Sequence, residues 1–189
     1  MNRSSLIVAA ALCALAVVPA QAASIYLSPA SSSVPLSAGT VTLELFADFT
    51  NEPTVGGGID LAFAGPTSLS GFTPSSWFTT VPDPAFTGYG SANADADFEI
   101  HFGNFAGLSG LNKLGDLTLN LSGLGQIQVA MAINSLYGDF FPTTGIDPLD
   151  VTLGGADVNV VPLPASVWLL GTAVAALAGR RRLRKALTT

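Results

Sequence analysis

Apolar and polar residues alternate at every second position through much of the chain, the spacing of a strand with one buried face. Residues 95–102 show it most cleanly. The apolar set is Ala96, Phe98, Ile100 and Phe102, and the polar set is Asp95, Asp97, Glu99 and His101. The same period recurs in residues 40–49, 59–63, 117–121 and 127–133, and a last strand is expected in 149–161. Turn-forming residues separate these runs, which predicts about nine short strands.

Strands of this kind predict an all-β fold, a two-sheet antiparallel β-sandwich of jelly-roll type. Helical character is confined to the apolar segments at the two ends, where we expect an N-terminal signal helix and a single C-terminal transmembrane helix. The predicted organisation is a signal peptide at 1–22, an extracytoplasmic sandwich domain at 23–161 and a tail at 162–189.

The N-terminal segment has the three parts of a secretory signal peptide. Arg3 precedes an apolar run at residues 6–18, and Ala20 and Ala22 supply the small residues that signal peptidase reads. We expect cleavage after Ala22. The only cysteine, Cys13, lies inside this segment, so the mature protein has no thiol and no disulfide.

The C-terminal segment is uncharged from residue 158 to 179 and then strongly basic. Pro162 and Pro164 disfavour a helix at its start, so we expect a transmembrane helix at 165–179, near the lower limit of about 17 residues for crossing a bilayer. The basic end at 180–189 consists mainly of Arg180, Arg181, Arg182, Arg184 and Lys185. Basic residues beside a span stay cytoplasmic, which places the preceding domain outside the inner membrane.

The same segment resembles a known sorting signal. Its proline motif is Val161-Pro162-Leu163-Pro164-Ala165, followed by Trp168-Leu169-Leu170-Gly171 and the arginine cluster. Residues 162–189 are similar to the PEP-CTERM tail of Gram-negative bacteria, in its VPLPA-type variant with Leu in place of Glu. The resemblance implies recognition by an exosortase, cleavage near the proline motif and a transient inner-membrane anchor. It implies a final place at the cell surface or in the exopolysaccharide matrix. A permanent tail anchor is the alternative.

The middle of the chain resembles the cohesin-like domains of extracellular bacterial proteins. The resemblance rests on four stretches in order, at residues 25–29, 38–43, 55–63 and 114–119. The third reads Val55-Gly56-Gly57-Gly58-Ile59-Asp60-Leu61-Ala62-Phe63, and Ala64-Gly65-Pro66 then stands where the family usually has Asp-Pro. This resemblance implies the sandwich fold; dockerin binding is not carried over with it, because a fold does not fix a function.

The charge of the domain differs sharply from that of the whole chain. All 13 acidic residues lie between Glu44 and Asp157, and Lys113 is the only basic residue of 23–161, so this part carries about −12. No basic patch is present to neutralise phosphates, which argues against nucleic acid or an anionic membrane as a partner of the domain.

Catalytic motifs are absent from the sequence. His101 is the only histidine, no cysteine remains in the mature chain, and no Gly-x-Ser-x-Gly or phosphate-binding loop occurs. These absences predict that the protein is not an enzyme.

Two groups of residues are candidates for binding. Asp95, Asp97 and Glu99, with His101, would project from one face of a strand and could offer oxygen ligands to Ca²⁺. Asp139, Asp147 and Asp150 could add to such a site if the fold brings them near. The alternative is a solvated outer face that holds no metal.

The second group lies in residues 72–89, which are rich in aromatic residues and prolines. Trp77 and Tyr89 could stack on sugar rings; alternatively, the aromatic residues close one end of the core. The sequence therefore predicts a noncatalytic secreted protein, sorted by an exosortase, with exopolysaccharide as a possible partner. The alternative function is a glycan- or protein-binding module.

Overall fold

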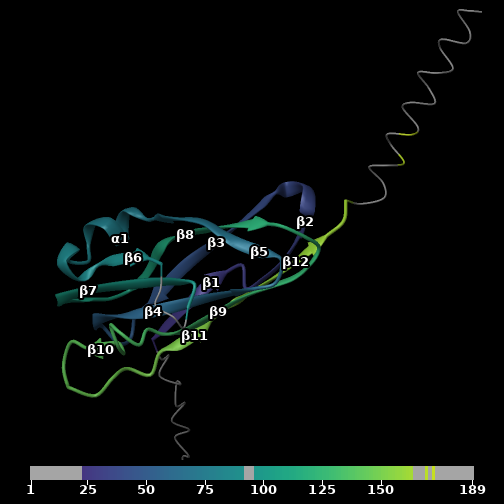
Figure 1. Cartoon of the computed structure of the whole chain (residues 1–189). Coiled ribbons are helices and arrows are strands. Elements are labelled where there is room, and N and C mark those ends of the chain that lie inside the picture. Colours follow the sequence, from purple (N-terminus) through teal and green to yellow (C-terminus); the bar gives the residue numbers. More distant parts are fainter. Residues whose placement is uncertain (1–22, 92–95, 164–168, 170–171, 173–189) are drawn as a thin grey trace, which may run out of the picture.

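The protein is seen in a computed structural model that describes residues 23–91, 96–163, 169 and 172 (Figure 1). Two sheets face each other across one core. The five-stranded sheet has the order β11 (Thr152–Gly154), β1 (Ser24–Ser28), β3 (Thr40–Asp48), β8 (Leu111–Leu121) and β5 (Thr67–Pro74). The seven-stranded sheet has the order β2 (Ser31–Pro35), β12 (Ala156–Val161), β9 (Gly125–Ile133), β4 (Thr54–Ala64), β7 (Phe98–Leu108) and β6 (Gly88–Gly90), with β10 (Phe141–Pro142) paired to β4.

The all-β two-sheet sandwich is confirmed, but the sheets are mixed and not purely antiparallel. β1 pairs in parallel with β11, and β2 pairs in parallel with β12. The expected last strand is split at Gly155, where a Cβ atom would lie 2.3 Å from the carbonyl oxygen of Val129. Its two halves, β11 and β12, join different sheets. β11 runs parallel to β1, and β12 runs parallel to β2. Both sheets therefore contain a parallel pair that local alternation does not reveal.

The core lies between the sheets and follows the predicted alternation. Phe98, Ile100 and Phe102 of β7 are buried, as are Leu117, Leu119 and Leu121 of β8. Leu43 and Leu45 of β3 oppose Ile59 and Leu61 of β4 from the other sheet in one cluster. Each such side chain contributes roughly 1.5–3 kcal/mol when fully buried, so this cluster is the main source of stability in a domain without disulfides.

Short helices join the strands between β5 and β6. α1 (Ser76–Thr80) begins at Ser75, whose hydroxyl accepts a hydrogen bond from the backbone N–H of Phe78 at 3.1 Å. Phe78 is buried and packs edge-on against Phe72, with ring centroids 6.0 Å apart. The 3₁₀ helices η1 (Leu36–Ala38) and η2 (Pro84–Phe86) are shorter still. Phe72 and Phe78 thus belong to the core, which agrees with the alternative that this segment closes its end.

The expected signal peptide and tail lie largely outside the described residues. Positions 1–22 are not described, and of the helix expected at 165–179 only Leu169 and Thr172 are. Within the described part of the chain, no helix has both the length and the hydropathy needed to cross a bilayer. β12 ends at Val161, and Pro162 and Leu163 follow it without regular secondary structure.

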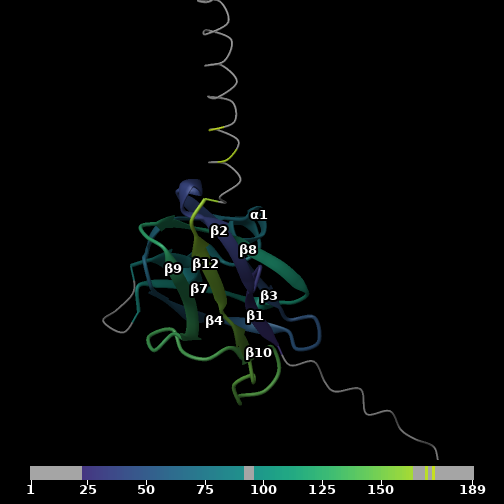
Figure 2. The same cartoon turned by 90° about the vertical axis from the view of Figure 1, so that its right-hand side faces the viewer.

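The chain leaves β12 at the end of the sandwich opposite β10 (Figures 1 and 2). The strand registers agree, because Val160 pairs with Gly125 at the start of β9, while Phe141 of β10 pairs with Gly56 at the start of β4. The start of β4 and the exit of the chain are therefore separated by nearly the full length of that strand.

Candidate functional site

Residues 134–141, which we name the crossing loop, leave β9 and pass over the outer face of β4 at Gly58. The loop then brings Phe140 to the core side at Gly57. Two glycines of β4 leave room for this passage. A Cβ atom on Gly57 would lie 2.8 Å from Cγ of Phe140, and one on Gly58 would lie 3.0 Å from the Cβ of Tyr137. Any larger residue at these positions would push the crossing loop away, so the glycine run of β4 and the loop above it depend on each other.

Asn134 fixes the start of the crossing loop. Its side chain is 1% exposed, and its backbone N–H donates to the carbonyl oxygen of Gly58 at 2.9 Å. Its Oδ1 accepts hydrogen bonds from the backbone N–H groups of Leu136 and Tyr137, both at 2.8 Å. The buried amide is thus well partnered, as a buried polar group must be to avoid a large free-energy cost.

The same amide lies between two carboxylates on the outer face of the seven-stranded sheet. Asp60 of β4 and Glu99 of β7 are directly opposite each other in register. Nδ2 of Asn134 is 2.5 Å from Oδ1 of Asp60 and 3.4 Å from Oε2 of Glu99. Like charges directly opposite each other on a sheet are unfavourable, and a neutral amide supplies hydrogen bonds without cancelling either charge. This face therefore carries two adjacent carboxylates without a positive partner from the described chain.

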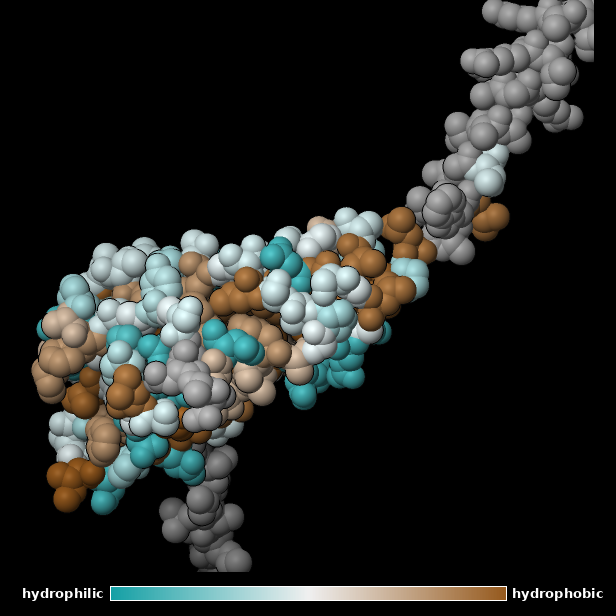
Figure 3. Space-filling view, viewed as in Figure 1, coloured by the Kyte–Doolittle hydropathy of each residue, from teal (hydrophilic) through white to brown (hydrophobic). Residues whose placement is uncertain are grey.

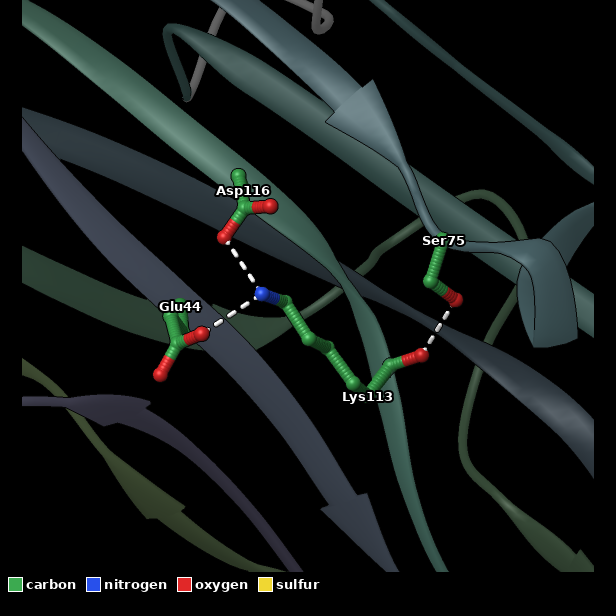
Figure 4. Close-up of polar contacts among 4 residues, drawn as sticks. All are labelled: Glu44, Ser75, Lys113 and Asp116. Atoms are coloured by element: carbon green, nitrogen blue, oxygen red, sulfur yellow. Dashed lines mark hydrogen bonds and ion pairs between the residues drawn. The ribbon is translucent and has the colours of Figure 1, made fainter.

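The one basic side chain of the domain is bound elsewhere. Lys113 lies on β8 of the five-stranded sheet, with Nζ 2.6 Å from Glu44 and 2.7 Å from Asp116 (Figure 4). Hydrogen bonds to Asp116 and then to Glu44 raise the pKa of Lys113. Its backbone carbonyl also accepts a hydrogen bond from the hydroxyl of Ser75. Lys113 therefore neutralises carboxylates on the opposite sheet and leaves the Asp60–Glu99 pair without a counterion.

His101 lies on the same outer face, with glycine on both sides. It pairs with Gly58 of β4 and Gly88 of β6, and Tyr137 of the crossing loop stacks on its ring with centroids 3.7 Å apart. Its Nδ1 is buried without a hydrogen-bond partner among the described residues. Burial lowers the pKa of His101, while the charge of Glu99 acts in the opposite direction. The imidazole is therefore neutral at neutral pH.

The lowered pKa of His101 predicts a loss of stability in mild acid. The unfolded chain takes up the proton first, so the stabilising contribution is complete above the ordinary pKa of about 6.5 and is lost as the pH falls through the folded-state value. We expect the free energy of unfolding in urea to fall between about pH 7.5 and 5.5. His101→Gln should flatten the dependence in this range, because the chain has no other histidine. An equal slope in both proteins would contradict the assignment.

A hollow of about 260 Å³, which we name the aromatic pocket, opens beside His101 at the start of β4. Besides His101, five aromatic residues line it: Phe86, Phe102, Phe105, Tyr137 and Phe141. Phe86 and Phe105 meet edge to face with centroids 5.0 Å apart, although Phe105 is 76% exposed. Asp139, an acidic residue, also lines the pocket. Hydrophobic side chains gather over this end of the molecule, near β6, β7 and β10 (Figure 3).

The residues of the predicted calcium site take different roles. Asp97 turns back on the sheet, where its Oδ2 accepts a hydrogen bond from the backbone N–H of Phe63 at 2.7 Å. Glu99 lies beside Asn134, and Asp95 is outside the described residues. Across the described ranges, no group of three or more His, Cys, Asp or Glu side chains is placed to hold a metal ion. Calcium binding at Asp95, Asp97 and Glu99 stays a prediction.

Trp77 and Tyr89, the two predicted glycan-binding residues, have different surroundings. Trp77 is half-buried and packs edge-on against Phe102 of the core at 6.2 Å. Tyr89 is exposed and borders a separate hollow of about 220 Å³ with Pro74, Pro82 and Pro84, which Trp77 does not line. Phe105, which is 76% exposed against 47% for Tyr89, was not singled out from the sequence, because only the fold brings it next to Phe86 of the 72–89 segment.

No protein-family model matches the chain, and no curated protein sequence matches it.

Solved cohesin structures, in contrast, match its fold. The seventh ScaB type I cohesin of Pseudobacteroides cellulosolvens has a TM-score of 0.58 at 7% identity, covering 76% of this chain and 94% of that one. A non-cellulosomal cohesin of Archaeoglobus fulgidus gives 0.53 at 9% identity, covering 77% and 95%. The OlpC cohesin of Clostridium thermocellum, solved in a type I cohesin–dockerin complex, gives 0.55 at 14% identity, covering 75% and 95%. At these identities the likeness shows the fold alone, and this chain has a cohesin-like β-sandwich.

Proposed function

We propose that the mature chain is a noncatalytic extracytoplasmic module that binds a partner protein through the outer face of its seven-stranded sheet. We also propose that an exosortase reads its C-terminal tail and delivers it to the cell surface or the exopolysaccharide matrix. The cohesin-like fold supports the first part, since several solved relatives of this shape are described in complex with dockerins.

The observation that carries the binding proposal is the Asp60–Glu99 pair. Its two carboxylates lie side by side at the buried Asn134, and neither forms an ion pair among the described residues. Asp60 also borders a hollow of about 220 Å³, and most of the other residues that line it are small. These residues are Ala62, Ala96, Ala130, Ala132 and Ser135, with Met131 and Ile133. A partner with basic side chains would supply the missing charge and could lie close to the sheet.

The sorting proposal draws support from the end of β12. Pro162 and Leu163 follow the last strand directly and have no regular secondary structure. A protease binds such a backbone more readily, because its hydrogen-bonding groups are not paired within a helix or sheet. An anchor at this end would hold the start of β4 away from the membrane by about 3.4 Å per residue of strand. The crossing loop and the aromatic pocket would then face outward.

Charge substitution on this face tests the binding proposal. The variant Asp60→Asn with Glu99→Gln keeps the size of both side chains and removes both charges. We expect proteins cross-linked to the wild-type chain in its native host to be recovered about tenfold less with this variant, which corresponds to about 1.4 kcal/mol. Asp48→Asn with Asp150→Asn removes the same charge elsewhere and should leave recovery unchanged.

Quantitative mass spectrometry of the cross-linked material measures the recovery. If no protein depends on Asp60 and Glu99, the protein-binding proposal is contradicted. Recovery of exopolysaccharide in place of protein would favour the glycan-binding alternative. Recovery of neither would favour a structural role in the matrix.

A further inference from the structure

We propose that the aromatic pocket holds an organic cation, the guanidinium or ammonium group of an Arg or Lys side chain on a basic protein segment. This inference rests on the proposed function, because the segment would belong to the partner of the seven-stranded sheet. It adds a second contact, at the end of that sheet, and a chemical class for the group bound there.

The lining of the pocket fits a cation in shape and in electronic character. The negative faces of aromatic rings attract ammonium and guanidinium groups within about 6 Å of the ring centroid. Phe86 and Phe105 stand on one side of the hollow, and Tyr137 and Phe141 come from the crossing loop and β10 on the other. Pockets for drug-sized ligands are about 300–1,000 Å³, so a hollow of about 260 Å³ suits one side chain and not an extended polymer.

Charge decides between a cation and other ligands. Asp139 lines the hollow, and neither ion pair among the described residues involves it. The domain as a whole carries about −12, because Lys113 alone offsets its 13 acidic residues. Such a field attracts cations and repels phosphates, sulfates and acidic sugars. Neutral sugars gain nothing from it, so the observations favour a basic side chain over a glycan.

The pocket lies close to the carboxylate pair. His101 lines the pocket, and Glu99 lies two residues before it on the same face of β7, at a spacing of about 7 Å. Asp60 is opposite Glu99. A basic segment lying along this face could place one cation at Asp60 and Glu99 and a second in the aromatic pocket. Two such contacts would give the complex a defined direction along the sheet.

Three peptide and sugar probes test the proposal with the full-length chain in a neutral detergent. The first is an arginine-containing hexapeptide, and the second is the same peptide with citrulline, a neutral isostere of arginine. The third is a neutral hexasaccharide of glucose. We expect calorimetry to show binding of the arginine peptide and at least about fivefold weaker binding of the citrulline peptide, as a partly exposed cation–π contact predicts.

Variants of the pocket separate it from general electrostatic attraction. Phe105→Ala removes an exposed ring without changing charge, and Asp139→Asn removes a charge without changing shape. Each should weaken the arginine peptide about fivefold. The matched controls are Leu124→Ala, which removes an exposed apolar side chain elsewhere, and Asp48→Asn, which removes one charge from the other sheet. Neither control should alter binding at the pocket.

Each remaining outcome overturns the inference. Equal affinities for the arginine and citrulline peptides would show that the pocket does not recognise the positive charge. Equal losses in pocket and control variants would show attraction by the whole domain. Binding of the hexasaccharide that Phe105→Ala abolishes would make the pocket a glycan site. The proposed function fails separately, when partner recovery does not depend on Asp60 and Glu99, so a pocket that reads no cation leaves that proposal standing.

Discussion

Replacing Pro162 and Pro164 by alanine is expected to leave the chain in the inner membrane, with its C-terminal arginines still attached. Proline fixes its own backbone, disfavours a helix and favours an extended backbone in the residue before it. Pro162, the described one of the two, follows β12 without regular structure. With alanine, the apolar helix expected at 165–179 can extend toward Val161, and the motif loses the unpaired backbone that a protease must bind. The measurement is the intact mass of the protein from each fraction of its native host.

In the wild type, we expect a mass that begins at Ala23 and ends near residues 161–165, in the surface or medium fraction. The double variant should instead run to Thr189 and remain in the inner membrane. Pro148→Ala, in the loop before β11, is the matched control and should be processed normally. A wild-type mass that runs to Thr189 in the inner membrane would mean that the tail is a permanent anchor, and the sorting proposal would be contradicted.

The strands of the core could be predicted because burial on a sheet leaves a local signature. Leu117, Leu119 and Leu121 occupy every second position of their strand. This spacing is enough to assign the three side chains to one face of the sheet. The parallel pairing of β1 with β11 leaves no such signature, because it joins residues more than 120 positions apart. A local pattern shows that a strand exists and which face it buries, but not its neighbour.

The candidate site was only partly predictable for the same reason. The outward position of Glu99 and His101 follows from alternation, and the glycine run at 56–58 marks a place where something approaches the backbone closely. What approaches is the crossing loop, and Asn134 of that loop is 74 residues from its partner Asp60. Asp97, a predicted calcium ligand, accepts a backbone hydrogen bond from Phe63, because β4 runs beyond its last pair with β7 and the N–H of Phe63 needs another acceptor.

Phe140 should be the most sensitive single position of the crossing loop. Its ring is fully buried and lies 5.5 Å from that of Phe49 and 5.6 Å from that of Phe102. Phe140→Ala removes these contacts and leaves a cavity, so the free energy of unfolding should fall by about 3–5 kcal/mol. Phe105→Ala, the same chemical change at an exposed position, should alter it by no more than about 0.5 kcal/mol. Similar losses in the two variants, measured in urea, would contradict the role of Phe140 as an anchor.

Gly57 provides a sharper test, because a side chain added at position 57 would enter the space that the ring of Phe140 occupies and that Phe140→Ala leaves empty. A Cβ atom at position 57 would meet Cγ and Cδ1 of Phe140 at 2.8 and 2.9 Å. Gly57→Ala alone should therefore destabilise the fold. In the Phe140→Ala background the contacts with the ring are gone, and only the backbone oxygen of Asp139, at 3.0 Å, stays close to the new methyl group. We expect the double variant to lose about 0.5–3 kcal/mol less free energy of unfolding than the two single variants lose together. Strict additivity would mean that the crossing loop does not rest on β4 through this contact. The aromatic pocket, which takes Tyr137 and Asp139 from that loop, would then need another support.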